Sequence, residues 1–436
     1  MHWSLTLLMI FGGVTTLMMA GIPVAFAFLV VDIVGIYFFF GAAGLQQLIV
    51  SMFSSISTFT LLPLPLFILM GELLYHSGVA PVIIATLDQW LGRIPGRLSL
   101  LAVSTGTLFA TLTGTSVGSV AMIGSTLLPE MHRRGYQRPM TLGPIMASGG
   151  LAIMIPPSGL AVLLGVIGEI SVGQTLVAII IPGLLLAFVY ALYIILRCYR
   201  QPSLAPAYDV QTVSLGEKLL GLTAYVLPIG IVIFLVIGVI LLGIATPSEA
   251  AASGVLGTML LAAYHRRLTL EVLVKSLSST LEISAMILLI ITGATAFGQI
   301  LALSGASKGL SELAIGLPVA PILIIVAMQI VVLIMGMFME VVSIMLITLP
   351  IFMPIVRGLG FDPVWFGVLF LVNAEVALIS PPFGISLFVM KAVSPPGTTM
   401  RDVYTAALPF VGLIIFVMVL IMIFPDLALW LPRLAG

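Results

Sequence analysis

The sequence predicts an all-α polytopic membrane protein built from two inverted repeats, and three observations support this fold class. Hydrophobic residues make up 61% of the 436 residues and charged residues only 7%, whereas charged residues are about a quarter of a soluble protein. A double proline recurs 225 positions later, because Pro156 and Pro157 become Pro381 and Pro382 (156 + 225 = 381). Lys and Arg cluster at intervals, as they do in cytoplasmic loops.

The duplication extends beyond the double prolines. Pro129 maps to Pro354 and Gly135 to Gly360 at the same offset of 225 (129 + 225 = 354; 135 + 225 = 360). Corresponding segments interrupted by Gly and Pro in two halves of a membrane protein indicate a transport site. The predicted division is therefore residues 1–212 for the first inverted repeat and 213–436 for the second.

Long uncharged runs predict several bilayer spans of about 20 residues each. Asp32 is the only formal charge in residues 1–71, and Glu169 the only one in residues 139–196. The first apolar run has no basic flank and continues into a second, so we expect a retained span rather than a cleaved signal peptide. Asp32 and Glu249 are expected near span ends, in solvated positions.

In chain order, the expected elements alternate between simple spans and interrupted ones. The first repeat is predicted to contain spans at 4–20, 22–40 and 49–76, a hairpin at 98–131, a broken helix at 139–170 and a span at 176–196. The second is predicted to contain spans at 219–242, 247–264 and 276–304, a hairpin at 319–356, a broken helix at 363–394 and a final span at 403–424.

The first hairpin is predicted from its flanking charges. Arg93 and Arg97 precede the uncharged run and Arg133 and Arg134 follow it, so both ends are expected in the cytoplasm, yet the run is too short for two full crossings. An external N-terminus places every Lys and Arg inside except Lys308, Arg357 and Arg433. This threading starts the two halves from opposite sides of the membrane.

The broken helices carry the functional prediction. Proline removes an amide hydrogen, so the prolines at 156 and 157 leave the carbonyls of Ala152 and Ile153 without helical partners. Unwound carbonyls coordinate small cations, and the N-terminus of a half-helix attracts an anionic group. A simple kink inside an ordinary span is the alternative, but repetition of the break after a hairpin candidate favours a binding site.

Two carboxyl groups at membrane depth have open roles, because ionisable residues there are costly to bury. Glu340 follows the second hairpin tip, and Glu375 precedes the second double proline. Each is expected to ligate a cation, relay a proton or cap backbone amides, and we favour a helix-start role for Glu340. The single cysteine, Cys198, provides no disulfide or CxxC motif.

The chain resembles the large membrane subunit of tripartite ATP-independent periplasmic (TRAP) transporters. The matching stretches are TGTSVGSVAMIG at 113–124, PEMHRRGY at 129–136, IPPS at 155–158, GMFMEVVSIMLITLPIFMPIV at 336–356 and NAEVALISPPFGISLFVMK at 373–391. This resemblance implies an elevator-type, sodium-driven importer of organic acids in the bacterial inner membrane. It also implies two partners, a small four-helix membrane subunit and a periplasmic substrate-binding protein.

The resemblance also implies where the ligands bind. The first sodium site is expected at Thr113, Thr115, Ala152, Ile155 and Pro157. The second is expected at Gly336, Ala377, Ser380 and Pro382. The substrate is expected near Ser116, Ser158, Met337, Glu340, Glu375 and Gly384. Sodium is the only metal expected, and no organic cofactor is expected.

Two further questions separate the possible functions. No Lys or Arg lies in the predicted mid-membrane region, so half-helix N-termini and bound cations would hold an anion, which favours a small monocarboxylate.

An intramembrane hydrolase is a different class of function, yet Ser116 has no histidine at its depth to serve as a base. A proton-coupled transporter, a channel and a scaffold subunit stay open as well. We expect a transporter and no enzymatic activity.

Overall fold

The computed structural model describes residues 3–92, 94–113, 116–206 and 214–434, and no strand occurs in these ranges. Their α-helices have the following bounds: α1 Trp3–Met19, α2 Val24–Ile56, α3 Pro63–Ser77, α4 Ala80–Trp90, α5 Arg97–Thr113, α6 Ser116–Arg133, α7 Arg138–Gly150, α8 Gly159–Ile167, α9 Val172–Ala178, α10 Ile180–Arg200, α11 Leu215–Gly221, α12 Leu227–Ile233, α13 Val239–Leu241, α14 Pro247–Tyr264, α15 Leu270–Leu303, α16 Ala306–Ile315, α17 Pro321–Gly336, α18 Val341–Gly358, α19 Pro363–Ile379, α20 Ile385–Val393, α21 Met400–Ile423 and α22 Asp426–Leu434. Short 3₁₀ segments at Phe59–Leu61 and Pro202–Leu204 and π-helical segments at Leu222–Val226 and Phe234–Gly238 join some of them.

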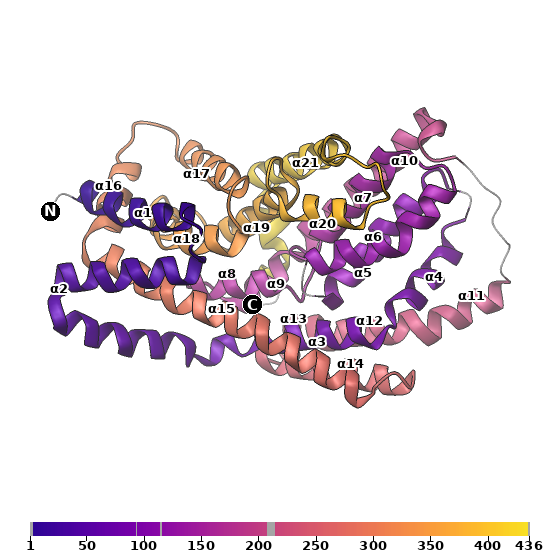
Figure 1. The fold of residues 1–436 in the computed structure, drawn as a ribbon, viewed down its shortest axis with the longest axis horizontal. Coiled ribbons are helices and arrows are strands. Elements are labelled where there is room, and N and C mark those ends of the chain that lie inside the picture. The colour runs from indigo at the N-terminus through magenta and orange to yellow at the C-terminus, as the bar shows by residue number, and fades with distance from the viewer. Residues whose placement is uncertain (1–2, 93, 114–115, 207–213, 435–436) are drawn as a thin grey trace.

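The helices form two layers (Figure 1). The long-helix layer consists of α2, α3 and α11 to α15, in which α15 packs against α2 and α3, and α14 against α3. The hairpin layer consists of α5 to α10 and α17 to α22, in which α5 and α6 pack on α7, and α17 and α18 on α19. Contacts of α3 with α5 and α8, and of α15 with α18, join the layers.

Seven helical runs of the described chain are long and apolar enough to cross a membrane. They are Val24–Ile56, Phe59–Ser77, Val172–Arg200, Leu215–Leu241, Leu270–Leu303, Val341–Gly358 and Met400–Ile423. Shorter apolar helices, among them α1, α17 and α19, complete the set. The protein is therefore a multi-pass, all-helical membrane protein, as the composition predicts.

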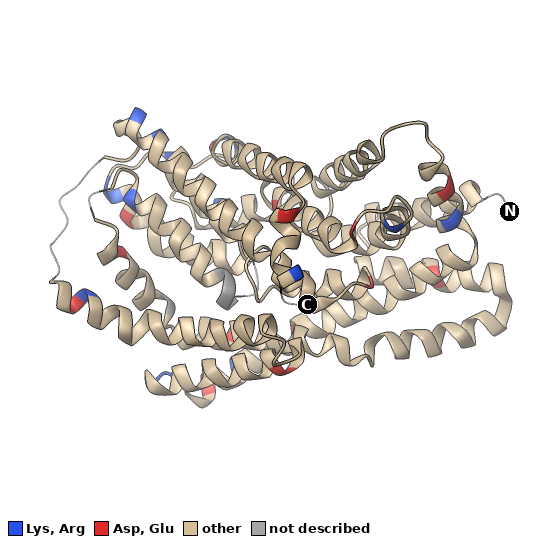
Figure 2. Ribbon diagram, turned by 180° about the vertical axis from the view of Figure 1, so that it is seen from behind, with Lys and Arg blue, Asp and Glu red and all other residues tan. Residues whose placement is uncertain are grey.

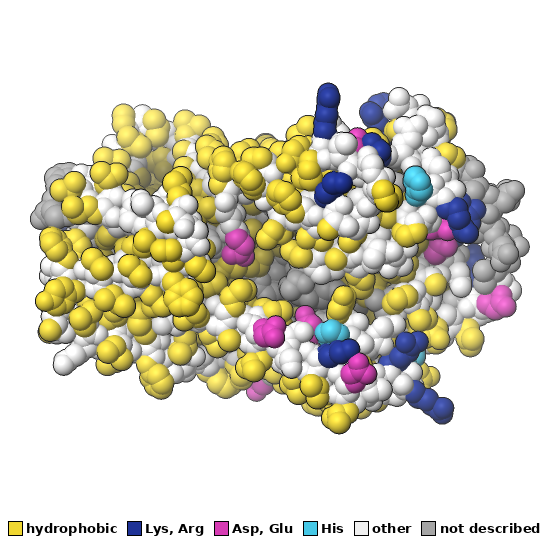
Figure 3. All heavy atoms as spheres, in the orientation of Figure 1, with side chains coloured by type: hydrophobic (Ala, Val, Ile, Leu, Met, Phe, Trp, Pro, Cys, Tyr) yellow, Lys and Arg dark blue, Asp and Glu magenta, His cyan; other side chains and the backbone are white. Residues whose placement is uncertain are grey.

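Charge is distributed along the longest axis of the molecule. Lys and Arg seen on the face in Figure 3 lie in its right half, whereas the left half is largely hydrophobic. Figure 2 shows the same bias on the ribbon, where most Lys and Arg lie toward the end opposite the N-terminus. The long helices α2 and α15 run along this axis (Figure 1).

Two pairs of consecutive helices occupy the segments in which the hairpins were predicted. The first is formed by α5 and α6 at 97–133, and the second by α17 and α18 at 321–358. They are entered from opposite ends of the long axis: α5 follows α4 at the right of Figure 1, and α17 follows the loop at the left. Both predicted broken helices are also interrupted, α7 from α8 at residues 151–158 and α19 from α20 at 380–384.

Some boundaries differ from the prediction. The two spans expected at 22–40 and 49–76 are separate in the structure, because α2 consists of two helices that meet at Gly41, whose φ of 66° is left-handed, but the second helix begins before residue 49. Glycine adopts this conformation without steric cost. The spans expected at 176–196 and 276–304 are longer in the structure, and α4, α16 and α22 were not predicted. These three have 9 to 11 residues, too few for a span and therefore not visible to a search for spans.

The expectation for Asp32 is wrong. Asp32 lies within α2, is completely buried, and neither carboxyl oxygen has a hydrogen-bond partner among the described residues. The α2 face that carries it packs on α15, with Phe28 edge-on to Phe297 at 4.9 Å between ring centroids. The expectation for Glu249 is confirmed, because it begins α14 in a capping box with Thr246, an arrangement that satisfies two free amide groups.

A buried amide pair fastens the second hairpin to the second broken helix. The Nδ2 atom of Asn373 donates to the carbonyl oxygen of Gln329 at 2.7 Å and to its Oε1 at 2.9 Å. Both side chains are at most 2% exposed. Such bonds between membrane helices contribute about 1 kcal/mol.

We therefore expect Asn373→Leu to lower the melting temperature of the purified protein, because it removes both hydrogen bonds and leaves the Gln329 side chain without a partner. Differential scanning fluorimetry in detergent measures the shift. Gln46→Leu, the same polar-to-apolar kind of change at an exposed position of α2, is the control and should not shift it. Equal melting temperatures for Asn373→Leu and the wild type would show that the pair does not hold the hairpin.

Candidate functional site

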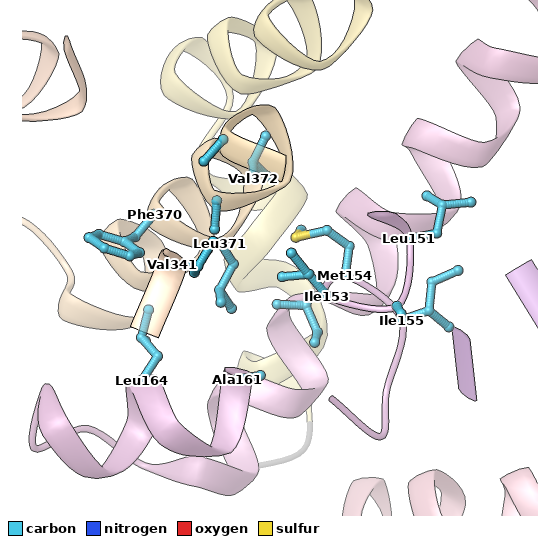
Figure 4. Packing of buried hydrophobic residues seen from close by; sticks show 14 of the residues in the cluster. Leu151, Ile153, Met154, Ile155, Ala161, Leu164, Val341, Phe370, Leu371 and Val372 are labelled. Atoms are coloured by element: carbon cyan, nitrogen blue, oxygen red, sulfur yellow. The ribbon is translucent and has the colours of Figure 1, made fainter. Parts of the chain in front are cut away.

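The first break frees backbone carbonyls at the centre of the hairpin layer. Pro156 and Pro157 have no amide hydrogen, so the carbonyls of Ala152 and Ile153 lack their helical partners, and no other described group donates to them. The two prolines are joined by a cis peptide bond. All residues from 151 to 158 are buried. Figure 4 shows Ile153 and Met154 beside Leu371 of α19, so the first break packs against the second broken helix.

Neighbouring residues hold the first break in place. The Ser158 hydroxyl accepts a hydrogen bond from the amide of Ala161 at 3.3 Å and begins α8. Gly183 of α10 packs directly on the Met154 carbonyl, where a Cβ would clash. Serine at the start of a helix satisfies one of its free amides, so Ser158 acts in the structure as a cap.

The second break is built in the same way but is more open. Pro381 and Pro382, also joined by a cis bond, remove the partners of the Ala377 and Leu378 carbonyls. Ser380 ends α19, and its carbonyl accepts from the amide of Gly384 at 3.0 Å. Unlike Pro157, which is buried, Pro382 is exposed in the isolated chain.

A tyrosine that the sequence did not indicate contacts the second break. The Tyr404 hydroxyl of α21 donates to the Pro382 carbonyl at 3.0 Å. A carbonyl oxygen has two lone pairs, so Pro382 keeps one for another ligand. No sequence signal pairs residues 382 and 404, because the contact depends on how α21 packs on the break.

Each hairpin tip lies against a broken helix because small residues permit the approach. A Cβ on Gly336 would lie 2.5 Å from the Cβ of Ala377, and a Cβ on Gly149 would lie 3.2 Å from the Ser116 carbonyl oxygen. Close approach of this kind is the usual role of small residues between membrane helices. The two tips and the two breaks therefore meet in one region.

A cavity of about 380 Å³ lies where they meet. Five predicted site residues line it: Ser116, Ala152, Gly336, Glu340 and Ala377. The long-helix layer closes its other side with α3 and α15. Seven further predicted residues belong to the same tips and breaks but do not line the cavity: Ile155, Pro157, Ser158, Met337, Ser380, Pro382 and Gly384. Thr115 and the side chain of Thr113 lie outside the described residues.

Glu340 is the charged residue among those lining the cavity, and no described Lys, Arg or His lines it. It occupies the N-cap position of α18, as the sequence predicts, and its carboxyl group lies beside the amides of Val342 and Ser343. A carboxylate offers about four lone-pair sites, so Glu340 can interact with a ligand in the cavity. Apolar residues form most of the remaining wall, so a charged ligand group has few side-chain partners here.

Glu375 faces away from the cavity. Its Oε1 accepts a hydrogen bond of 2.7 Å from the Tyr190 hydroxyl of α10, and both residues are completely buried. The carboxyl side chain occupies the space beside Gly150, where a Cβ would lie 2.7 Å from the Glu375 Cγ. In the structure, Glu375 thus joins α19 to α7 and α10 rather than contacting the cavity.

The chain is similar to known proteins in sequence and in fold. The sequence profile described as "Tripartite ATP-independent periplasmic transporter, DctM component" matches residues 11–427. A C4-dicarboxylate TRAP transporter large permease of Pseudomonas aeruginosa is 32% identical, with 91% of this chain and 92% of the relative aligned. An ectoine TRAP transporter large permease of Halomonas elongata is 28% identical, with 96% and 97% aligned. The fold also matches the YdaH transporter of Alcanivorax borkumensis, with a TM-score of 0.66 at 16% identity and with 88% and 89% of the chains covered.

A transporter fold whose cavity lies between hairpin tips and broken helices defines a membrane permease. More particularly, the chain belongs to the DctM family, the large permease component of tripartite ATP-independent periplasmic transporters. The predicted family is confirmed, and so is the prediction that the chain is not an enzyme, because its relatives are permease subunits. The names of these two relatives give a C4-dicarboxylate and ectoine as the compounds that they transport.

Proposed function

We propose that this permease imports a small organic monocarboxylate together with sodium. The observation that carries the proposal is the pair of breaks, whose unpaired carbonyls lie beside the hairpin tips at one cavity. Oxygen atoms without donors suit a small hard cation, and half-helix N-termini suit a carboxylate. Both α8 and α20 begin at this place.

The freed carbonyls fit sodium at both breaks. Ala152 and Ala377, which differ by the repeat offset (152 + 225 = 377), each have a carbonyl whose helical partner is replaced by proline, and both residues line the cavity. In the proposed first site, the Ala152 oxygen acts with Ile155, Pro157 and the first hairpin tip. In the proposed second site, the Ala377 oxygen acts with Gly336, Ser380 and Pro382. Sodium is transported with the substrate and orders the tips when it binds.

The absence of a basic side chain among the described cavity residues supports a substrate with one carboxylate. A second carboxylate would have to be buried against Glu340 and an apolar wall, which is costly without a partner. We propose that Ser116, Ser158, Met337, Glu340 and Gly384 surround the substrate and that Glu375 supports the site from behind. Strong uptake of a dicarboxylate without uptake of any monocarboxylate would contradict this substrate class.

We propose that the two halves are inverted repeats that move as an elevator. Support comes from α6 and α18, whose bounds differ by 225 at both ends (116 + 225 = 341; 133 + 225 = 358), and from the opposite directions from which the hairpins enter. In this mechanism the hairpin layer slides against the long-helix layer and carries the cavity across the membrane. A small four-helix subunit and a periplasmic binding protein are the proposed partners, and the bacterial inner membrane is the proposed location.

Sodium should raise the melting temperature of the purified permease relative to potassium or choline at equal ionic strength. A ligand that binds only the folded state at about 100 times its Kd stabilises that state by about 2.7 kcal/mol. Ser380→Leu should remove the sodium-specific increment, because it places a bulky side chain at the second break, where Ser380 is only 2% exposed.

The control is again Gln46→Leu, which should retain the increment. A wild-type protein that melts at the same temperature in sodium, potassium and choline would overturn sodium coupling. Uptake that follows a pH gradient instead would then favour proton coupling through Glu340 or Glu375.

A further inference from the structure

A second cavity of about 440 Å³ lies between the two layers, beyond the first. Its wall on the hairpin layer comes from the end of α8 and from α18, including Glu169 and Arg357. Its wall on the long-helix layer comes from the end of α2 and from α15, with Ser307 of α16 beside them. We call the long-helix side of this cavity the outer wall; it consists of Ser55, Thr58, Ile291, Ala294, Thr295, Gly298, Gln299 and Ala302.

The first cavity meets the same layer at a different place. Its wall there, the inner wall, consists of Leu64, Ile68, Ile283, Met286 and Ile287. Both walls use α15, first at residues 283–287 and then at 291–302. Because an α-helix rises 1.5 Å per residue, Ile287 and Gln299 are separated by about 18 Å along the axis. The inner wall is entirely apolar, whereas the outer wall contains four polar side chains, those of Ser55, Thr58, Thr295 and Gln299, among apolar ones.

The outer wall presents hydrogen-bond acceptors to its cavity. The hydroxyl of Thr295 donates to the Ile291 carbonyl at 3.0 Å, and that of Ser55 donates to the Met52 carbonyl at 2.8 Å. The Gln299 amide nitrogen donates to the Ser51 hydroxyl. These side chains donate hydrogen bonds to groups of their own layer, and their oxygen lone pairs remain free. The lone pairs would accept hydrogen bonds from water or from donor groups of a substrate.

The hairpin-layer side of the second cavity is held together independently. The Arg357 guanidinium donates to the carbonyls of Gly168 at 3.1 Å and Glu169 at 2.9 Å, so α18 caps the end of α8 within one layer. Ser307 of α16, a helix outside both layers as defined above, donates to the Pro350 carbonyl of α18 at 3.4 Å. A bond of this length is weak.

We propose that the outer wall is the long-helix side of the substrate site in the outward-facing state. This inference rests on the proposed elevator movement, which would carry the hairpin tips along α15 from the inner wall to the outer wall. At the outer wall the tips and the substrate would face oxygen acceptors, and at the inner wall they face only hydrocarbon. A monocarboxylate that also carries hydroxyl or amino donors is then bound with more hydrogen bonds outside than inside, which favours capture from the periplasm and release to the cytoplasm.

Paired cysteines test the position of the wall. Val117 is 38% exposed at the first tip and lines the first cavity. In a Cys198→Ala background, the inner pair is Val117→Cys with Ile287→Cys, and the outer pair is Val117→Cys with Thr295→Cys. Membranes that contain the complete transporter with one or the other cysteine pair are treated with mercuric ion and with short bifunctional thiol reagents.

We expect cross-links in both pairs, since both walls face the tip in one of the two states. Cross-linking of the inner pair without the outer pair would overturn the proposal and the sliding movement together. The sodium-dependent melting temperature is measured separately, so this outcome is distinguishable from a failure of sodium coupling.

The role of the polar side chains of the outer wall is tested with the outer cysteine pair. Gln299→Leu and, separately, Ser55→Ala should lower the ratio of outer to inner cross-link about five-fold, the effect of one lost hydrogen bond. Gln47→Leu, at an exposed position of α2, should leave the ratio unchanged. If the outer pair cross-links but neither substitution changes the ratio, the elevator movement is retained and the proposed role of the polar wall is overturned.

Discussion

Gly384→Ala is expected to abolish the sodium-dependent rise in melting temperature. A Cβ at this position would lie 2.6 Å from the Leu378 carbonyl oxygen and 2.9 Å from the Ser380 carbonyl oxygen, closer than real Cβ atoms approach backbone atoms. The contacts are with backbone rather than with a flexible side chain, so the second break itself must move. Since the proposed sodium ligands are carbonyls of that break, their positions would be lost.

The matched control is Gly412→Ala in α21, where an added Cβ meets no atom within 4 Å. This variant should keep the full sodium-dependent increment, because it makes the same chemical change away from the break. Thermal melts of both variants in sodium and in choline measure the difference. A normal increment in Gly384→Ala would show that the second break is not a sodium site.

Glu375→Leu is expected to lower the stability of the protein by about 1–3 kcal/mol, the cost of leaving a buried polar group without a partner. The group concerned is the Tyr190 hydroxyl, whose hydrogen bond of 2.7 Å to Glu375 connects α10 with α19. Both residues are fully buried, so water cannot replace the lost acceptor. The free energy of unfolding, or the melting temperature as its proxy, is the measurement.

Glu375→Gln separates hydrogen bonding from charge. Its side-chain carbonyl can still accept from Tyr190, so this variant should melt near the wild-type temperature. If Glu375→Gln were as unstable as Glu375→Leu, the carboxyl group would be needed for more than this hydrogen bond. A stable Glu375→Gln that no longer imports substrate would instead indicate a proton-transfer role.

Local chemistry made much of the candidate site predictable. Pro156, Pro157, Pro381 and Pro382 remove amide hydrogens wherever the chain folds, so both breaks and their free carbonyls follow from the residues themselves. The hairpins follow from apolar length between charged flanks. Glu340 at the start of α18 is likewise a local feature, because a carboxylate complements a helix N-terminus.

Contacts between distant segments could not be predicted. Tyr404 reaches the second break only because α21 packs beside it, and Tyr190 meets Glu375 only because Gly150 leaves room between α7 and α19. The residues on both sides of Asp32 in the sequence are apolar, as in the other predicted spans, and they do not show which face of the helix is buried. The complete burial of Asp32 results from packing of α2 on α15. The break at Gly41 agrees with the predicted span end at residue 40, but the start of the next helix before residue 49 was missed, because uncharged residues continue on both sides of it.

Composition and the covalent features of single residues were enough to predict that this protein crosses a membrane many times and interrupts two of its helices at double prolines, and its motifs resemble those of the family that the profile match then showed. Helix packing was needed to show that both tips and both breaks meet at one cavity, that Glu375 faces Tyr190 rather than that cavity, and that a polar wall lies beyond an apolar one. Burial and hydrogen-bond partners depend on which helix faces pack together, and residues far apart in the chain make those faces.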